Sequence, residues 1–506
     1  MRLLTLVVVL AGCGEVVDNP FEGGFLVSAE PASVFVRRGE TQTVTVTVAR
    51  DDGFDADITF TVPDLPTGVT TNTLVIAGSE STGMLIIDAA DAAEQGAVDT
   101  NVSGVGGGNA NDAALRLLVG GPPGTVDESF AGDGTFTTTV PGMVLISRAL
   151  ALTDAGIVVT GSTATQAIAA RIDGDGDLDT SFGGAGFVST GTGAFSEGIA
   201  VAPLGDGSIV VAGIAGGPGG SGDNDFGIFK YSAAGELDTT FGNSGVAAFD
   251  PGAGTGELHT IAVESSGSLI VAGDLFASPL VGRALRFSAA GVRDNAYSIT
   301  ETDALIEASL LQADGKLVLA GAQGGDFWIA RYNANASRDN GFGTNGIAII
   351  DFGEAATASS VIAVTGGKLL VVGIATPVGA PLKHVVVARL NANGSPDLAF
   401  GVGGKVSTTL AFDTRSPNSA ILDGNGRIVI VGAVTNVPSV ARLLPDGTPD
   451  STFGIAGIAS VDFGVAGTTV QTGGYGIGID SDGRIIFAGE VGPSGGQQMA
   501  VSRLWP

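Results

Sequence analysis

The sequence has few of the residues on which most enzyme active sites and metal centres depend. Its 506 residues include one cysteine, two histidines, two tryptophans and four tyrosines. The single cysteine, Cys13, excludes an intramolecular disulfide bond. The histidines, His259 and His384, stand far apart in the sequence and show no recurring acidic partner. A Ser-His-Asp triad or a multi-histidine metal site is therefore not indicated.

Basic residues are also scarce. The chain has 23 Lys and Arg against 52 Asp and Glu, which gives a formal net charge of −29. A field of this sign repels phosphate backbones, so we do not expect nucleic-acid binding. The excess of acidic residues is typical of a soluble surface, and the alternative is an attraction for cations such as Ca²⁺.

Beyond the N-terminus, the sequence has no uninterrupted apolar run of the roughly 18 residues that a spanning helix needs. The N-terminus has a positive Arg2, a short apolar stretch over Leu3–Leu10, and then Ala11-Gly12-Cys13, which is typical of a secretory signal. These last residues resemble the lipobox of bacterial lipoproteins. The resemblance implies cleavage after residue 12, acylation of Cys13 and a tether over residues 13–24. Gly14 rather than Asp favours the outer membrane, and the alternative is an ordinary signal peptide.

Short runs of Val, Ile and Thr, separated by Gly, Asp and Asn, predict an all-β protein. In residues 25–120, Thr41–Val48 alternates strictly between polar and apolar residues, as in a strand with one buried face. The number of such strands predicts an N-terminal β-sandwich. The segment Leu65-Pro66-Thr67-Gly68-Val69 and the turn at Gly39 resemble bacterial immunoglobulin-like modules. The disulfide and tryptophan of antibody domains are missing, so the resemblance implies the architecture alone.

A Gly/Pro-rich boundary at residues 120–124 precedes a repeat that continues to residue 506. One marker is Phe followed four residues later by Gly. It occurs at Phe130, Phe182, Phe241, Phe342, Phe400 and Phe453, with a degenerate copy at residues 294–297. A second marker is a turn ending in Gly before an apolar strand that also ends in Gly. Its seven copies are 156–161, 207–213, 267–273, 315–321, 367–373, 426–432 and 483–489.

Each unit is expected to form four antiparallel strands, because tight turns separate its apolar runs. In the third unit these strands are Val246–Phe249, His259–Val263, Leu269–Ala272 and Ala284–Phe287. The last unit lacks the Phe marker, while a spare copy at residues 126–134 precedes the first unit. Complementary ends favour a closed ring over a solenoid, so we predict a seven-bladed β-propeller over residues 124–506.

The repeat resembles the delta-60 repeat family of bacterial surface and secreted proteins, which is propeller-like. The resemblance rests on the Asp-Gly turn before a Val-Ala-Gly strand, an Ala-Arg-Leu strand such as Ala388-Arg389-Leu390, and a following Asp-x-x-Phe-Gly segment. It implies a fold and no particular reaction.

Two sets of charged residues are candidate sites. The densest acidic cluster alternates with glycine, as calcium loops do, and comprises Asp173, Asp175, Asp177 and Asp179. The alternative is a turn with extra acidic residues. Arginines recur at one repeat position: Arg171, Arg331, Arg389, Arg442 and Arg503. We expect each to pair with a turn aspartate of its own blade, such as Asp179, Asp397 or Asp450, and the alternative is an axial ring that binds an anion.

These features predict a lipid-anchored envelope protein, bound to the membrane through Cys13, that presents a propeller for binding, adhesion or scaffolding. We expect a monomer with a protein or glycan partner, contacted through loops such as 213–225 and 274–282. The alternative is a propeller hydrolase or lyase with an axial active site. That alternative requires carboxylates or histidines, distant in sequence, that converge on the channel.

Overall fold

The computed structural model describes residues 24–138, 146–163, 165–192, 195–216, 224–250, 255–377, 379, 383–412, 419–465, 473–492 and 496–506. Cys13 and the predicted signal segment lie outside these residues, as does nearly all of the predicted tether. The described chain is all-β, and its one helical segment is the 3-10 turn η1 (Thr365–Gly367). Within it, no helix has the length and apolar character needed to cross a bilayer.

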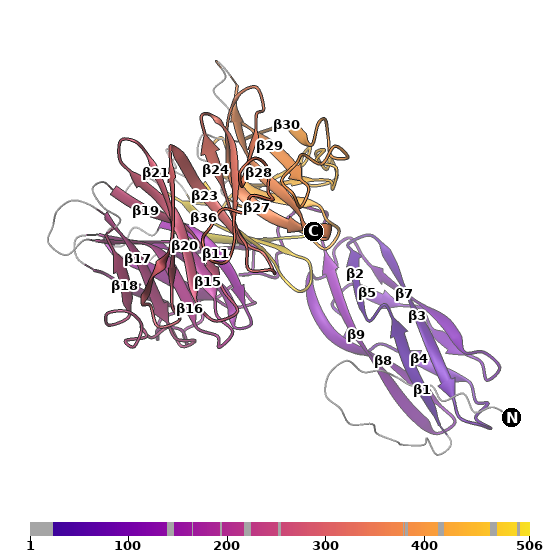
Figure 1. Cartoon of the computed structure of the whole chain (residues 1–506). Coiled ribbons are helices and arrows are strands. Elements are labelled where there is room, and N and C mark those ends of the chain that lie inside the picture. The colour runs from indigo at the N-terminus through magenta and orange to yellow at the C-terminus, as the bar shows by residue number, and fades with distance from the viewer. Residues whose placement is uncertain are drawn as a thin grey trace. The chain divides into compact units, whose positions relative to one another are not determined.

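The chain divides into two compact units, residues 1–120 and 121–506. The first unit contains two sheets (Figure 1). One sheet has the strand order β1 (Phe25–Glu30), β3 (Thr41–Arg50), β7 (Thr82–Ala89), β5 (Val69–Thr71). The other has the order β2 (Ser33–Arg37), β9 (Asn109–Gly120), β8 (Gly96–Gly106), β4 (Ile58–Thr61), β6 (Leu74–Ile76).

The core of this unit lies between its two sheets. The alternation predicted for Thr41–Val48 is present in β3, where Val44, Val46 and Val48 are buried and the threonines between them are exposed. These valines share one apolar cluster with residues of the other sheet, including Phe60 and Leu117. Because side chains alternate between the two faces of a strand, β3 buries one face against the opposite sheet and leaves the other in water.

The described residues of the second unit form seven four-stranded antiparallel sheets. The first four are β11 (Ile146–Thr153), β12 (Gly156–Ser162), β13 (Ala167–Ile172), β14 (Phe187–Thr190); β15 (Ser196–Pro203), β16 (Ile209–Gly216), β17 (Asn224–Tyr231), β18 (Val246–Phe249); β19 (Thr255–Val263), β20 (Leu269–Phe276), β21 (Val281–Phe287), β22 (Arg293–Thr302); and β23 (Ala304–Leu311), β24 (Leu317–Gln323), β25 (Asp326–Tyr332), β26 (Ile347–Ile350). The other three are β27 (Ala355–Val364), β28 (Lys368–Thr376), β29 (Lys383–Leu390), β30 (Lys405–Phe412); β31 (Ser419–Leu422), β32 (Ile428–Val434), β33 (Val437–Leu443), β34 (Ile458–Ser460); and β35 (Gly473–Ile479), β36 (Ile485–Val491), β37 (Gln498–Leu504), β10 (Thr135–Thr138).

The predicted grouping of strands in the third unit is wrong in one respect. Val246–Phe249, expected to open that unit, is β18 and pairs with β17 of the preceding sheet. The fourth strand of the third unit is instead β22, which pairs with β21. The reason is the turn at Phe241–Gly245, where the Gly245 amide donates to the Phe241 carbonyl. This turn reverses the chain, so the strand that follows it runs back beside the strand that precedes it.

The first strands of the seven sheets contact one another in a closed cycle. The contacts run β11 to β15, β15 to β19, β19 to β23, β23 to β27, β27 to β31, β31 to β35, and β35 back to β11. Between neighbouring sheets lie apolar clusters, such as the one in which Phe241 packs with residues of both β16 and β20. Each sheet therefore buries both faces against its neighbours.

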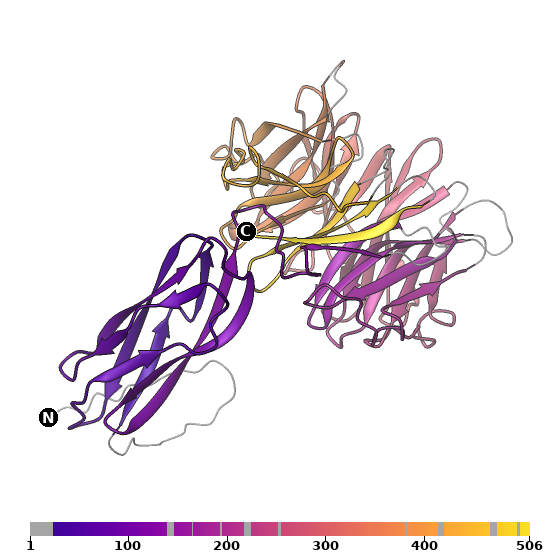
Figure 2. The same cartoon turned by 180° about the vertical axis from the view of Figure 1, so that it is seen from behind.

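The two ends of the repeat share one sheet, as the complementary ends of the sequence predicted. Strand β10 pairs with β37 in the register Thr135↔Ser502 to Thr138↔Met499. In Figure 2 the yellow C-terminal strands lie beside a purple strand from the start of the second unit. The Asp127 carboxylate, fully buried, accepts hydrogen bonds from Arg503 Nε at 2.7 Å and Arg484 Nη1 at 3.3 Å.

Candidate functional site

The recurring arginines serve the sheets that carry them, as predicted. Each lies on the third strand of its sheet and pairs with an aspartate at 2.6 to 2.8 Å: Arg171–Asp179, Arg331–Asp339, Arg389–Asp397, Arg442–Asp450 and Arg503–Asp127. Lys230–Asp238 and Arg286–Asp294 occupy the same place in the other two sheets. In six sheets the guanidinium group also lies over the ring of the marker residue, with its central carbon 4.4 to 4.9 Å from the ring centre. The marker is Phe in five of these sheets and Tyr297 in the other. The alternative of an axial arginine ring is therefore wrong.

Two aspartates of the candidate calcium cluster, Asp173 and Asp179, are engaged in hydrogen bonds with neighbouring groups. Asp173 Oδ1 accepts the amides of Asp175, Gly176 and Asp177 at 3.0 to 3.1 Å, which is an aspartate-capped turn. Asp179 is held by Arg171 and Ser181, and the hydrogen bonds from Ser181 lower its pKa. Nowhere in the described ranges do three His, Cys, Asp or Glu side chains group as a metal ion would need. Calcium at this turn stays a prediction, which melting curves with Ca²⁺ and with EDTA would test.

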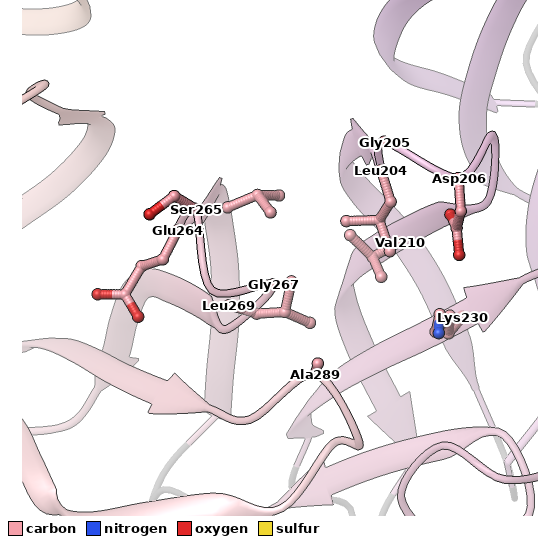
Figure 3. A pocket seen from close by; sticks show the side chains of 11 residues that line it. Leu204, Gly205, Asp206, Val210, Lys230, Glu264, Ser265, Gly267, Leu269 and Ala289 are labelled. Carbon is pink, nitrogen blue, oxygen red and sulfur yellow. The ribbon is translucent and has the colours of Figure 1, made fainter.

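A pocket of about 390 Å³ lies at a seam between two sheets (Figure 3). Asp206 and Lys230 come from one sheet, and Glu264 and Ser265 from the next. The charged groups already have partners, since Lys230 pairs with Asp238 at 3.0 Å and the Asp206 carboxylate accepts from Ser208. The pocket lies between the β15–β16 and β19–β20 turns, and we assign it to the seam between two sheets.

A different pocket, of about 280 Å³, lies where the first strands of the sheets meet. Its lining comes from all seven of these strands, β11, β15, β19, β23, β27, β31 and β35. Because the same strands form the closed cycle, the pocket lies on the axis of the ring. We call it the axial pocket.

Among the described residues, a β-bulge in six of the seven first strands, which we call the inner strands, places one residue in the axial pocket. In six of the seven inner strands, the pairing with the second strand skips one residue, as between Leu258 and Thr260. The skipped residues are Arg148, Ile199, His259, Glu307, Ser359 and Tyr475, and all six line the pocket. A bulge re-aims a side chain out of the alternation of the strand, and bulges are frequent beside functional sites. These six are the bulge residues.

The bulges explain the glycine that ends the second marker. Gly213, Gly273, Gly321 and Gly373 each lie on a second strand opposite a bulge. A Cβ at Gly273 would collide with the carbonyl oxygen of Glu257, and the other three would meet the equivalent carbonyl. The inner strand thus approaches the second strand too closely for any side chain at this position.

On one side of the axial pocket, His259 lies between two carboxylates. Its Nε2 is 3.3 Å from Asp274 Oδ2, and its Nδ1 is 3.8 Å from Glu307 Oε2. Asp274 is fully buried, and its Oδ1 accepts the amide of Ile306 at 3.0 Å. Burial opposes the imidazolium charge, but contact with Asp274 and attraction by Glu307 raise the pKa of His259 to about 9. The imidazole is therefore protonated at neutral pH.

Burial changes the pKa values of the two carboxyls in the direction opposite to its effect on the pKa of the imidazole. Burial raises the pKa of Asp274, although the His259 contact acts against this shift. Burial also raises the pKa of Glu307, again opposed by His259. Burial thus opposes the ionisation of both carboxyls, while the imidazolium between them favours it.

On the other side, Arg148 and Tyr475 form a second cluster. Arg148 Nε donates to Glu197 Oε1 at 2.6 Å, and the guanidinium carbon lies 5.3 Å from the centre of the Tyr475 ring. Burial lowers the pKa of Arg148, but Glu197 outweighs this effect and the net shift is upward. The Tyr475 hydroxyl donates to Glu490 Oε1 at 3.2 Å. Thr260 and Ser309 add a hydroxyl pair at 2.7 Å.

The sequence reasoning missed this site. It treated His259 and His384 as lacking acidic partners, whereas His259 contacts Asp274 and Glu307, and His384 Nε2 is 3.6 Å from Glu354. The partners of His259 come from β20 and β23, the latter in the next sheet, so no local pattern joins them. One signal was present in the sequence. The glycine that ends the second marker pairs with the residue just before the bulge, so the hairpin register locates the bulge residue.

Five segments of the chain match one protein family, described as a domain of unknown function (DUF5122) beta-propeller. They are residues 156–182, 204–241, 312–342, 367–400 and 424–453. Each ends at the marker Phe, and none includes a bulge residue, so the match concerns the blade scaffold rather than the axial pocket. No curated protein shows significant similarity. By its strands and by this match, the chain is a propeller-like repeat protein.

Proposed function

We propose that this protein is a bacterial envelope lipoprotein whose seven-bladed propeller binds a small polar ligand in the axial pocket. An immunoglobulin-like β-sandwich over residues 25–120 precedes the propeller in the chain. Support for seven blades comes from the seven sheets, the cyclic contacts of their first strands and the shared last sheet. The resemblance to the delta-60 repeat agrees with this architecture.

One observation carries the binding role: the six bulge residues differ in chemistry, whereas the scaffold positions repeat. The Arg–Asp pair recurs in six sheets and a Lys–Asp pair takes its place in the seventh, because the pair serves each sheet. A structural need common to all blades would select one residue type at the bulge as well. Arg, Ile, His, Glu, Ser and Tyr stand there instead. Half-buried side chains of differing type, most of them polar and gathered in one pocket, are typical of a binding site.

A pocket-filling variant tests the binding role. Ser359→Trp places a large side chain on the axis, and we expect it to exclude a ligand that the wild-type protein retains. Native mass spectrometry and extraction of small molecules from both proteins measure the difference. The matched control is Ser288→Trp, on the β21–β22 turn and outside the axial pocket lining. Equal extracts from wild type and Ser359→Trp would contradict an axial binding site.

The envelope location rests on the lipobox-like segment before Cys13. We propose an acylated Cys13, anchorage in the outer membrane, a monomeric state and a partner that is protein or glycan rather than nucleic acid. Labelling cells with a palmitate analogue should mark the wild-type protein and leave Cys13→Ser unmarked. Label on Cys13→Ser, or none on the wild type, would contradict the anchor.

The second candidate function is an axial hydrolase or lyase. It is favoured by the convergence of His259, Asp274 and Glu307, because a carboxyl with a raised pKa suits a general acid. Against it, His259 is protonated at neutral pH and cannot accept a proton as a general base. Glycan cleavage that is lost in Glu307→Gln and kept in Glu354→Gln would favour the enzyme over the binding protein.

A further inference from the structure

We infer that the axial pocket takes a small zwitterion of amino-acid size, with its carboxylate at Arg148 and its ammonium group at Glu307. This inference rests on the proposed binding role and specifies the ligand class. It depends on where these two side chains stand around the ring and on which of their polar atoms have no partner.

Arg148 and Glu307 come from nearly opposite positions of the ring. Following the contacts from β11, the strand β23 is reached through β15 and β19 in one direction, and through β35, β31 and β27 in the other. In a seven-membered ring, no pair of strands lies farther apart. Both residues are bulge residues and line the same pocket. A ligand that fills the pocket therefore meets a guanidinium at one end and a carboxylate at the other.

Arg148 is arranged to accept a carboxylate. Its Nε is occupied by Glu197, whose side chain is 9% exposed, so this pair fixes the orientation of the guanidinium plane. Among the described residues, its two terminal nitrogens have no hydrogen-bond acceptor. A planar guanidinium with two free donors matches the two oxygens of a carboxylate.

Glu307 is arranged to accept an ammonium group. No described residue donates a hydrogen bond to it, and its closest cation is His259 Nδ1 at 3.8 Å. Because Asp274 neutralises His259, the Glu307 charge is left in excess on this side. The Thr260 and Ser309 hydroxyls lie beside it and provide further acceptors for N–H groups.

Charge and size exclude the simpler ligands. An anion would gain Arg148 but face the carboxylates of Glu307, Asp274 and Glu197, whereas a cation without a carboxylate would leave Arg148 uncompensated. The pocket volume of about 280 Å³ is just below the ~300–1,000 Å³ typical of small-molecule sites. A molecule with one ammonium and one carboxylate matches the charges of both residues.

The test uses the full chain and a panel of probes. The twenty free amino acids and glycine betaine are compared with the ethyl ester and the N-acetyl derivative of each amino acid that binds, by calorimetry at pH 7. Maltose and galacturonate serve as a neutral and an anionic sugar. We expect at least one free amino acid to bind, and its ester and N-acetyl derivative to bind about tenfold or more weakly, because each lacks one charge.

Variants assign the two ends of the ligand. Arg148→Lys keeps the positive charge near Glu197 but loses the planar guanidinium group. It should weaken the binding of the free amino acid about tenfold and leave the binding of its ester unchanged. Glu307→Gln should weaken the binding of both the amino acid and its ester, because both carry the ammonium group. The charge-matched controls Arg283→Lys and Glu354→Gln lie outside the pocket lining and should bind as the wild type does.

The outcomes separate this inference from the proposed function. Binding of maltose or galacturonate that Ser359→Trp blocks, with no amino acid bound, would overturn the zwitterion and keep the axial site. Esters that bind as tightly as the free acids would also overturn it. Amino-acid binding that persists in Ser359→Trp would overturn both.

Discussion

At the scale of the residue, repeated and unrepeated positions of the ring differ in their partners. The repeated Arg or Lys, Asp and aromatic residues contact one another, and several arginines also reach the neighbouring sheet, as Arg331 Nη1 does at Ala392 O at 2.6 Å. These groups are engaged in the scaffold, although both terminal nitrogens of Arg442 are buried without a hydrogen-bond partner among the described residues. The unrepeated bulge residues face the axis instead, where Arg148 and Glu307 keep unused polar atoms.

Arg442 shows how much stability a scaffold arginine contributes. Its side chain is fully buried, donates to Asp450 at 2.8 Å and covers Phe453 at 4.4 Å. Arg442→Met would leave the Asp450 carboxylate buried and unpaired, so we expect a loss of about 3–5 kcal/mol in the free energy of unfolding. Urea denaturation measures this loss.

Two further variants test the reason for that loss. Adding Asp450→Asn to Arg442→Met should recover part of the stability, because no buried charge is left unpaired. The exposed pair Arg116–Asp99 provides a contrast, and Arg116→Met should cost less than about 1 kcal/mol. Equal losses in Arg442→Met and Arg116→Met would show that burial of the pair is unimportant.

The histidine in the axial pocket makes stability depend on pH. The unfolded chain releases the His259 proton near pH 6.5, whereas the folded chain holds it until about pH 9. The folded state thus binds the extra proton, so the full stabilisation, about 3 kcal/mol, is present below pH 6.5 and is lost as the pH rises to 9. Urea denaturation across this window should show the fall in the wild type and a smaller fall in His259→Gln.

The other histidine provides the control. His384→Gln leaves His259 as the chain's one imidazole, so that its titration can be followed by NMR without overlap. A titration midpoint at or below 6.5 would contradict the ion pairing with Asp274 and Glu307.

At the scale of the element, tight turns dock one sheet onto the next. The amide after the marker Phe donates to a carbonyl in the turn of the following sheet, as Gly343 N does to Asn393 O at 2.8 Å. The next residue in that turn, Gly394, has φ +81°, and a Cβ there would meet Gly343 N and the Phe342 ring. Glycine is needed here both for the backbone conformation and for the close approach.

Gly394→Ala should therefore destabilise the protein by more than about 1 kcal/mol, because strain and a steric clash act together. Gly424→Ala is the matched control, since its Cβ would meet nothing within 4 Å and its φ is not positive. Urea denaturation of both variants decides the point, and equal stabilities would refute the docking role of the Gly394 turn.

At the scale of the whole ring, one sheet made from both ends of the repeat closes the cycle. Residues of β10 and β37 are far apart in sequence but pair in register, including Thr137 with Ala500. A solenoid would leave two sheet edges without partners, whereas this pairing removes them. The buried Asp127, held by Arg484 and Arg503, adds a polar contact across the same junction.

An engineered disulfide tests this closure. In a Cys13→Ser background, Thr137→Cys/Ala500→Cys should oxidise readily and raise the melting temperature, because it closes a very long loop. In the control pair Thr137→Cys/Val501→Cys, the second cysteine moves one residue along β37 to the opposite face of the sheet. It should oxidise poorly. Equal oxidation of the two pairs would contradict the register of β10 with β37.

Local periodicity and spacing within one unit were enough to predict the strands, their turns, the repeat, the complementary ends and the Arg–Asp pairs. The same patterns misassigned Val246–Phe249 to the following sheet, because hydrophobic pattern does not tell which neighbour a strand pairs with. The axial pocket could not be predicted from local patterns and is visible in the tertiary structure alone. His259 and Glu307 meet there because bulges on neighbouring inner strands turn their side chains toward the axis, and Asp274 reaches them from β20. This axis exists only because the ring of sheets closes.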